Sequence, residues 1–343
     1  MRIMTDSPIR FPGLFGDWEF TASSTAFHVG GKAIYWYGIL IALGVVLALW
    51  FCMTQKEKYG ITEDDLLDAV LWGVPLSVVG ARVYYVIFYL DLFKKSDGSF
   101  DWGSAVAIWD GGLAIYGAVI AAILVGVVLC RKKGMKLGAL TDLVVMGFLI
   151  GQTVGRWGNF MNREAFGTET TLPWRMELTT VLGKTVDVHP TFLYESLWNV
   201  VGLLLIVFIV SKARRFDGEN TWFYFLWYGI GRFWIEGLRT DSLMLVPSIG
   251  LRASQLVAGI AVVAGIAAEV YFTRKFKGKP LLVPLAMNAE NKAAQKKLDG
   301  PISFAGKDTQ LLASSPRKLF LEKTEAYNAQ VKAAIEQTGQ KKA

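Results

Sequence analysis

Hydrophobic residues fall into long runs that shorter polar segments separate. A helix needs about 20 predominantly apolar residues to cross the hydrocarbon core of a bilayer. Seven runs approach or reach that length, although the second contains Pro75 and Arg82 and the sixth is short. We therefore predict an all-α polytopic membrane protein with seven transmembrane helices, at 34–53, 66–90, 113–130, 137–154, 191–210, 221–235 and 249–272.

The composition supports a membrane protein. Of 343 residues, 53% are hydrophobic and 19% are charged, whereas soluble domains carry about 25% charged residues. Cys52 and Cys130 lie within or at the end of apolar runs, so we expect them to pack as small residues without forming a disulfide. The few histidines and cysteines form no metal-binding pattern. We expect no metal, no cofactor, no nucleic-acid partner and no cleavable signal peptide.

Basic residues in the short connections predict the orientation. Lys and Arg cluster after the first, third, fifth and seventh runs, and the positive-inside rule assigns these segments to the cytoplasm. Lys94 and Lys95 are an exception on the other side. We expect an extracytoplasmic N-terminal segment at 1–33 and a membrane domain at 34–275. Within it, 155–190 forms a small outer loop subdomain with a β-hairpin at 173–188, and 276–343 forms a charged cytoplasmic tail.

The most polar stretch near the membrane follows the fourth run. Residues 155–167 hold two arginines, two asparagines and a glutamate between glycines at 155, 158 and 167. We interpret this stretch as a loop at the outer membrane surface, because glycine permits tight turns and the close approach of a ligand. A simple connecting loop does not need this set of polar side chains, so we predict a functional role for it.

Arg, Glu and Tyr residues gather in the outer halves of several predicted helices. Ionisable groups in a membrane are costly and are typical of functional sites, although a single one is more often an ion pair or an interface residue. Arg232 and Glu236 are four apart and are expected to pair. The arginines outnumber the glutamates, and the surplus positive charge favours a phosphodiester ligand. The residues are Arg82, Arg156, Arg232, Arg239, Glu164, Glu195, Glu236, Tyr37, Tyr116 and Tyr194.

These residues resemble the signature of bacterial prolipoprotein diacylglyceryl transferases. That family carries Gly-Arg-x-Gly-Asn-Phe-x-Asn-x-Glu followed shortly by Gly, which residues 155–164 and Gly167 match. Other blocks agree in the same order, over roughly 30–275. They lie at 34–38, 80–85, 109–117, 189–195, 231–239 and 254–255.

The resemblance implies transfer of the sn-1,2-diacylglyceryl group from phosphatidylglycerol to the lipobox cysteine thiol of a prolipoprotein. The products are a thioether and glycerol phosphate, and the implied location is the bacterial cytoplasmic membrane, with the N-terminus outside and the C-terminus cytoplasmic. The expected partners are phosphatidylglycerol, prolipoprotein signal peptides with a lipobox cysteine, and membrane lipids.

The resemblance also suggests roles for individual residues. Arg156 and Arg239 hold the phosphodiester and stabilise the leaving phosphate. Tyr116 stands where some members carry a histidine that has been considered a base, but a tyrosine hydroxyl with a pKa of about 10 is a poor base. The base is Glu164 or Glu195, or none is needed. The expected substrate-binding residues are Arg156, Asn159, Asn162, Glu164, Gly167, Tyr37, Arg82, Tyr194, Glu195, Arg232 and Glu236.

Two other functions fit the same charge pattern. A transporter or channel with an outward-facing anion site also places arginines in membrane helices. Transporters usually show internal repeats and broken helices near the bilayer midplane, and the sequence shows neither. A structural protein that binds phosphatidylglycerol without turnover is the second alternative.

Overall fold

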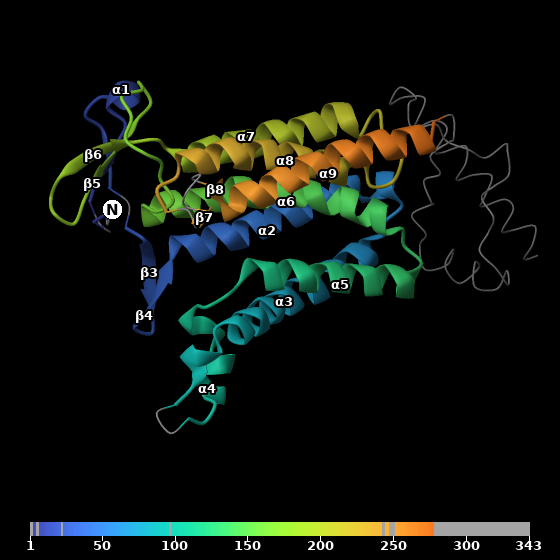
Figure 1. Ribbon diagram of the computed structural model, residues 1–343, viewed down its shortest axis with the longest axis horizontal. Helices are drawn as coiled ribbons and strands as arrows, with labels where there is room; N and C mark the ends of the chain where they lie inside the picture. The colour runs from blue at the N-terminus through green and yellow to red at the C-terminus, as the bar shows by residue number, and fades with distance from the viewer. Residues whose placement is uncertain are drawn as a thin grey trace, which may run out of the picture. The chain divides into compact units, whose positions relative to one another are not determined.

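The computed structural model describes residues 3–4, 7–21, 23–95, 98–241, 244–246 and 251–277 (Figure 1). It is mostly helical, and six helices are long and apolar enough to cross a membrane, so the predicted polytopic membrane fold is observed at that level. The predicted tail at 276–343 lies outside the described residues beyond residue 277. The helices are α1 (Pro12–Phe15), α2 (Trp36–Gln55), α3 (Glu63–Phe88), α4 (Trp102–Val106), α5 (Ile115–Lys133), α6 (Leu137–Asn162), α7 (Thr191–Leu205), α8 (Glu219–Leu238) and α9 (Ala253–Lys275).

The strands are short and all of their pairings are antiparallel. Three 3₁₀ turns and one π turn complete the described regular structure, at Lys56–Tyr59, Leu90–Phe93, Ile108–Asp110 and Ile206–Val210. The strands are β1 (Ile9–Arg10), β2 (Glu19–Phe20), β3 (Thr25–Val29), β4 (Lys32–Tyr35), β5 (Met176–Thr179), β6 (Thr185–Val188), β7 (Met244–Val246) and β8 (Leu251–Arg252).

The chain forms two compact units, which we describe separately. Of the described residues, unit 1 contains 1–54 and 141–277, and unit 2 contains 55–140. In unit 2, α3 and α5 pack closely at Gly80 and Gly117. A Cβ added at Gly117 would lie 2.2 Å from the carbonyl oxygen of Gly80, so only glycine fits there. Helix α3 begins with a capping box between Thr62 and Asp65.

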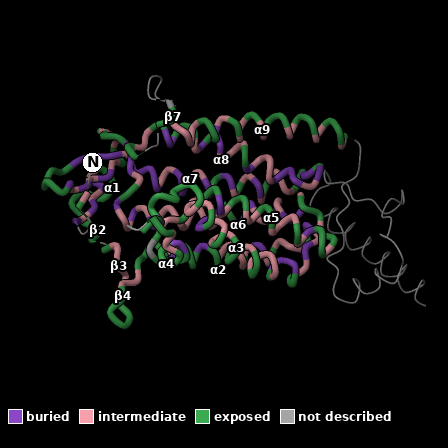
Figure 2. The backbone as a smooth tube through the Cα atoms, turned by 60° about the horizontal axis from the view of Figure 1, so that its bottom comes forward, coloured by how far each residue is buried: buried purple, intermediate pink, exposed green. Residues whose placement is uncertain are grey.

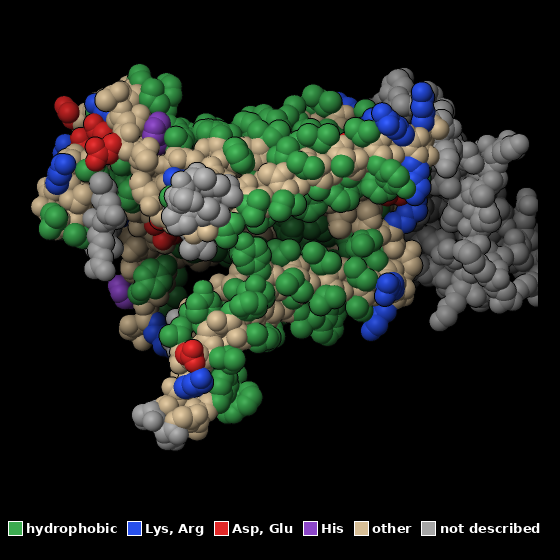
Figure 3. Space-filling view, viewed as in Figure 1, with side chains coloured by type: hydrophobic (Ala, Val, Ile, Leu, Met, Phe, Trp, Pro, Cys, Tyr) green, Lys and Arg blue, Asp and Glu red, His purple; other side chains and the backbone are tan. Residues whose placement is uncertain are grey.

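Helix α6 is the central helix of unit 1. Its residues Leu143, Met146 and Leu149 are fully buried, whereas much of α9 is exposed (Figure 2). Helix α2 lies against α6, since a Cβ on Gly44 would lie 3.3 Å from the Cα of Gly151. The flanks of α7 and α9 are covered with hydrophobic side chains (Figure 3), as expected for helices that face lipid.

A four-stranded sheet covers one end of unit 1, where α6 finishes and α7 begins. We call this end the sheet end. Its strand order is β2-β1-β5-β6, so the N-terminal segment and the hairpin at 176–188 share one sheet. The predicted hairpin is confirmed, but the participation of the N-terminal strands was not predicted. Phe11, Leu178 and Phe192 belong to the apolar core beneath the sheet.

The interpretation of 155–167 as a loop is wrong over its first part, because α6 continues to Asn162. Glycine lowers intrinsic helix propensity, but tertiary packing compensates for it here. Gly158 lies against the ring of Tyr37, where an added Cβ would be 2.4 Å from Cδ2. The chain leaves the helix only at 163–165, where Arg163 and Ala165 have positive φ angles of 52° and 55°.

Candidate active site

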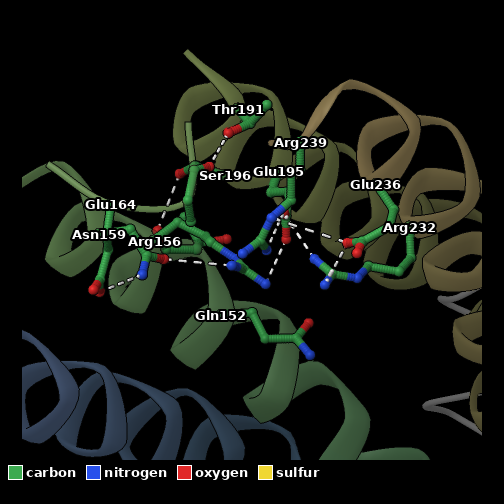
Figure 4. A network of polar contacts seen from close by, with 12 residues as sticks. Gln152, Arg156, Asn159, Glu164, Thr191, Glu195, Ser196, Arg232, Glu236 and Arg239 are labelled. Carbon is green, nitrogen blue, oxygen red and sulfur yellow. Dashed lines mark hydrogen bonds and ion pairs between the residues drawn. The ribbon is translucent and has the colours of Figure 1, made fainter. Parts of the chain in front are cut away.

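The polar residues at the sheet end come from three helices that converge there. The last turns of α6 provide Arg156 and Asn159, and the first turns of α7 provide Glu195. The end of α8 provides Glu236, and Arg239 follows at its C-cap. Figure 4 shows the arginines pointing toward Glu195. Because α6 remains helical, residues three apart on it share a face and can act together.

Glu195 is the acidic centre of this cluster. Its side chain is only 6% exposed, and Arg156 NH2 lies 2.5 Å from its Oε2. Arg232 NH1 donates to Oε1 at 3.1 Å, and Arg239 NH1 lies 3.9 Å from the same oxygen. Glu195 therefore joins α7 to α6 and α8, because arginines from both neighbouring helices contact its two carboxylate oxygens.

A second carboxylate, Glu236, supports the arginines of α8. Arg232 NH2 lies 2.6 Å from its Oε2, which confirms the predicted pair four residues apart. Arg239 Nε lies 4.0 Å from the same oxygen. Glu236 is almost fully buried, so its charge is balanced within the cluster.

A hydrogen-bonded chain connects the arginine cluster to Glu164. Arg156 NH1 donates to Asn159 Oδ1 at 3.4 Å, and Asn159 Nδ2 donates to Glu164 Oε1 at 2.9 Å. Asn162 Nδ2 donates to the same oxygen at 3.2 Å. Glu164 is exposed, and amide groups are its hydrogen-bond donors. The donors to Glu164 are therefore neutral amides, whereas charged guanidinium groups contact Glu195.

Asp241, which follows the end of α8, also binds Arg239. Its Nε and NH2 donate to the two carboxylate oxygens of Asp241, at 3.0 Å and 2.8 Å. The hydrogen bond from Arg239 is the main reason why the pKa of Asp241 is lowered. Asp241 was not predicted as a site residue, because a single acidic residue in a polar connection gives no distinguishing signal in the sequence.

The positive and negative charges of the cluster are more nearly equal in number than the sequence suggested. Three arginines, 156, 232 and 239, face two buried carboxylates, 195 and 236, which leaves one positive charge (3 − 2 = 1) before the half-exposed Asp241 is counted. The arginine side chains are 21%, 17% and 13% exposed. The guanidinium groups are therefore held by carboxylates of the chain and remain partly exposed.

Gln152 and Tyr224 were missed as neighbours of the cluster. Gln152 lies one helical turn before Arg156 and donates to the Tyr224 hydroxyl at 2.8 Å. Gln152 Oε1 is buried and has no hydrogen-bond partner among the residues that the structure describes. An amide inside the apolar run, four residues before an arginine, was the signal in the sequence that could have identified it.

Tyr194 and Gly167 lie at the edge of the site and make structural contacts. The Tyr194 hydroxyl accepts from Trp174 Nε1 at 2.7 Å and lies 3.1 Å from His189 Nδ1. Burial lowers the pKa of His189. Gly167 donates its N–H to His189 O, and a Cβ there would lie 2.6 Å from the Cβ of His189. Glycine is therefore required at 167 by packing.

Arg82 and Tyr116 belong to unit 2. The Arg82 guanidinium is buried and donates to four backbone carbonyls, those of Ser104, Ala105, Gly111 and Gly112. These contacts are structural and hold the segment that leads into α5. Tyr116 is 53% exposed, and its ring centroid lies 6.2 Å from that of Tyr84.

A cavity of about 830 Å³ lies beside Glu164. Asn162 and Glu164 contribute polar groups to its wall, and β4 and the first turns of α2 contribute the rest, including Tyr37. The volume falls in the range of ligand pockets. The hydrogen-bonded chain from Arg156 to Glu164 thus connects the arginine cluster to the wall of this cavity.

Neither a metal centre nor a protein nucleophile is evident in the described part of the chain. No group of three or more His, Cys, Asp or Glu residues there has metal-binding geometry. Cys52 and Cys130 are both free and buried, as predicted, and Cys52 lies 3.5 Å from Leu143 O.

Comparisons with known proteins agree with the residue pattern. The family model described as prolipoprotein diacylglyceryl transferase matches residues 24–271. The chain is 43% identical over 250 residues to the phosphatidylglycerol–prolipoprotein diacylglyceryl transferase of Finegoldia magna, covering 73% of this chain and 96% of the relative. It is 41% identical over 266 residues to the similarly named protein of Lysinibacillus sphaericus, covering 75% and 94%. The corresponding protein of Geobacillus kaustophilus is 40% identical over 260 residues, covering 73% and 92%.

Proposed function

The chain belongs to the prolipoprotein diacylglyceryl transferase family, and on this premise we propose that it transfers a diacylglyceryl group from phosphatidylglycerol to a prolipoprotein cysteine thiol. The observation that carries the proposal is the arginine cluster around Glu195, which is joined through Asn159 to Glu164 and the cavity. The protein is a transferase, and its membrane helices match a lipid substrate.

In the proposed reaction, the cysteine sulfur attacks the donor lipid. The attacked atom is the carbon of the diacylglycerol unit that is bonded to the phosphate oxygen. A carbon–sulfur bond forms, and the bond from that carbon to the phosphate oxygen breaks. The oxygen leaves with the bonding electrons as glycerol phosphate, and the thiol proton passes to a base. No redox partner is needed.

Arg156 and Arg239 are the proposed ligands of the phosphate. A guanidinium group binds a phosphodiester through two parallel hydrogen bonds, and its charge stabilises the phosphate as it leaves. Glu195 and Glu236 hold the guanidinium groups in position. Arg232 contributes positive charge from the next turn of α8, and Tyr37 and Tyr194 border the site.

Glu164 is the proposed base, and Asn159 and Asn162 fix its carboxylate. The thiolate is the reactive form of a cysteine, and an ordinary thiol has a pKa of about 8.5. The arginines lower that pKa further for a substrate thiol nearby. Of the two carboxylates considered from the sequence, Glu195 is already paired with arginines, which supports Glu164 instead. Tyr116 is proposed to donate a hydrogen bond and not to act as a base.

We further propose that the chain crosses the membrane seven times and that the sheet end lies on the outer side of the cell membrane. The 20 residues of α8 span about 30 Å at 1.5 Å per residue, which is enough to cross as a seventh helix. In unit 1, Lys and Arg gather at the end opposite the sheet (Figure 3). By their positions in the chain, Lys212 and Arg215 follow the π turn at Ile206–Val210, and Arg274 and Lys275 end α9. The positive-inside rule then supports an N-terminus outside and a cytoplasmic C-terminus.

This topology supports the domain division proposed for the chain. Segment 1–33 and the 155–190 subdomain lie outside, 34–275 forms the membrane domain, and 276–343 forms a cytoplasmic tail. The proposed partners are phosphatidylglycerol, surrounding membrane lipids and signal peptides with a lipobox cysteine.

The test of this function is a transfer assay with purified protein in lipid nanodiscs. Phosphatidylglycerol labelled in its acyl chains is incubated with a lipobox peptide, and the label on the peptide is measured. We expect label on a cysteine peptide and none on the same peptide with serine in that place. Stable lipid binding without label on the cysteine peptide would favour a structural lipid-binding protein.

A further inference from the structure

Strand β4 is a short strand beside the cavity with an edge that is open in the described structure. It pairs with β3 in a two-stranded sheet, and among the described residues no further strand joins that sheet. Its residues Ala33, Ile34 and Tyr35 line the cavity, opposite the polar pair of Asn162 and Glu164. An unpaired strand edge presents a row of backbone N–H and C=O groups.

The position of this edge matches the needs of a second substrate. The donor phosphate occupies the arginine cluster under the proposed function, so the acceptor polypeptide needs a separate place next to it. The cavity meets this requirement, because Glu164 is joined through Asn159 to Arg156 by hydrogen bonds of 2.9 Å and 3.4 Å. A polypeptide in the cavity would therefore have its thiol close to both the base and the guanidinium group.

We infer that β4 binds the acceptor polypeptide as an added strand, through main-chain hydrogen bonds along its open edge. Strand addition takes its affinity from main-chain hydrogen bonds, and pockets for alternate side chains add specificity. The occupant is thus an extended polypeptide segment that contains the acceptor cysteine and the residues after it. This inference rests on the proposed function and adds the mode of substrate binding to it.

The rest of the hairpin is compatible with this role. Phe27 and Val29 on β3 are 52% and 60% exposed, and a bulge between Thr25 and Phe27 interrupts the pairing. The hairpin joins α2 directly, since β4 ends at Tyr35 and the helix begins at Trp36. A bound strand would therefore be held at a fixed depth relative to α2 and Tyr37.

The first test uses a lipobox peptide with serine in place of the acceptor cysteine, so that binding is measured apart from turnover. Single backbone amides after the serine are methylated one at a time. Alternate amides of an added strand point toward β4, so we expect about tenfold weaker binding at every second position and little change between them. Equal effects at all positions, or none, would overturn the inference.

The second test is cross-linking to the hairpin. The serine peptide carries a bromoacetyl group two residues after the serine, and a cysteine thiolate displaces bromide from it to form a thioether. We expect rapid cross-linking of the Ala33→Cys protein. Val29→Cys, on the other strand and outside the cavity lining, is the matched control and should react slowly. Equal rates in the two variants would contradict the inference.

The two proposals fail in different ways. Periodic binding of the serine peptide without transfer to the cysteine peptide would contradict the proposed function and leave strand addition supported. Transfer that occurs without any periodic effect of methylation would contradict strand addition alone. A cavity occupied by lipid acyl chains would give the latter result.

Discussion

Buried polar clusters lie at both ends of the described part of unit 1, and they differ in the groups that contact their central carboxylates. At the end opposite the sheet, the fully buried Asp142 accepts from Gly218 N at 2.8 Å and from Thr221 N and Oγ1 at 2.9 Å and 3.0 Å. Arg214 NH1 lies 3.8 Å away. At the sheet end, Glu195 is surrounded by arginines from other parts of the chain.

We propose that the cluster around Asp142 is structural and that the cluster around Glu195 binds substrate. Asp142 satisfies backbone N–H groups at the start of α8, where a helix favours a negative charge. Such N–H groups occur at the start of every α-helix, and here a side chain of the protein satisfies them. The sheet-end arginines outnumber the buried carboxylates and remain partly exposed. The arginine cluster is therefore the proposed site of the lipid phosphate, whereas Asp142 already has its hydrogen-bond donors within the chain.

The largest expected effect is loss of transfer in the Arg156→Ala protein. Removing a group that stabilises developing negative charge typically lowers kcat by about 100- to 1,000-fold. The labelled-lipid assay measures it. Arg175→Ala is the matched control, since Arg175 pairs with Asp187 on the hairpin and should leave transfer near normal. Near-normal transfer by the Arg156→Ala protein would remove the central role of that residue.

Asp142→Asn is expected to act on stability instead. The substitution leaves buried donors at the start of α8 poorly satisfied, which costs about 1–3 kcal/mol. Thermal unfolding in detergent should show a lower midpoint, while transfer per folded molecule stays near normal. A loss of transfer as large as in the Arg156→Ala protein, with unchanged stability, would contradict the division between the clusters.

Gly158→Ala tests the contact between α6 and the cavity wall. The added Cβ would lie 2.4 Å from the Tyr37 ring, so the ring must shift. We expect kcat/KM to fall by about tenfold, because misplaced groups near a reacting centre lose rate steeply. Gly155→Ala is the matched control, since a Cβ there meets no atom within 4 Å. Equal activity of the two variants would show that the Tyr37 position does not matter.

Tyr116→Phe should have a smaller effect. Removing one hydroxyl that donates a single hydrogen bond costs about 0.5–1.5 kcal/mol, or roughly 2- to 13-fold in rate. Initial rates at saturating peptide measure this loss. Full activity would mean that the hydroxyl only packs, and complete inactivation would return Tyr116 to a central catalytic role.

The smallest effect concerns Asp241 and pH. Arg239 lowers the pKa of Asp241, so this carboxylate adds stability above its unfolded pKa of about 3.9 and loses it as the pH falls further. We expect the difference in unfolding midpoint between wild type and Asp241→Asn to stay constant from pH 8 to about 5. Below about pH 4 the difference should narrow. A difference that changes between pH 6 and 8 would contradict this assignment.

The sequence was informative where a pattern is local. Apolar runs located the long helices, and spacing predicted the Arg232–Glu236 pair, because both follow from helix geometry. The signature also identified Arg156, Asn159 and Glu164, which the structure joins into one chain of contacts. The resemblance to a transferase family is confirmed by the comparisons.

The sequence failed where long-range packing decides. The glycines at 155 and 158 suggested a loop, but packing against Tyr37 keeps that stretch helical. Arg82 was grouped with the other arginines by its depth in a predicted helix, and its contacts with backbone carbonyls could not be read from the sequence. The N-terminal strands join the hairpin from more than 150 residues away, since Arg10 pairs with Glu177, and only the fold makes that contact visible.

The proposed role of the arginine cluster is to bind the lipid phosphate and support transfer. Its most direct test is mass analysis of a lipobox cysteine peptide after incubation with phosphatidylglycerol and equal amounts of folded wild-type, Asp142→Asn or Arg156→Ala protein. The account predicts a mass gain of one diacylglyceryl group with the first two and an unmodified peptide with the third. Equal modification by all three proteins, or by none, would contradict it.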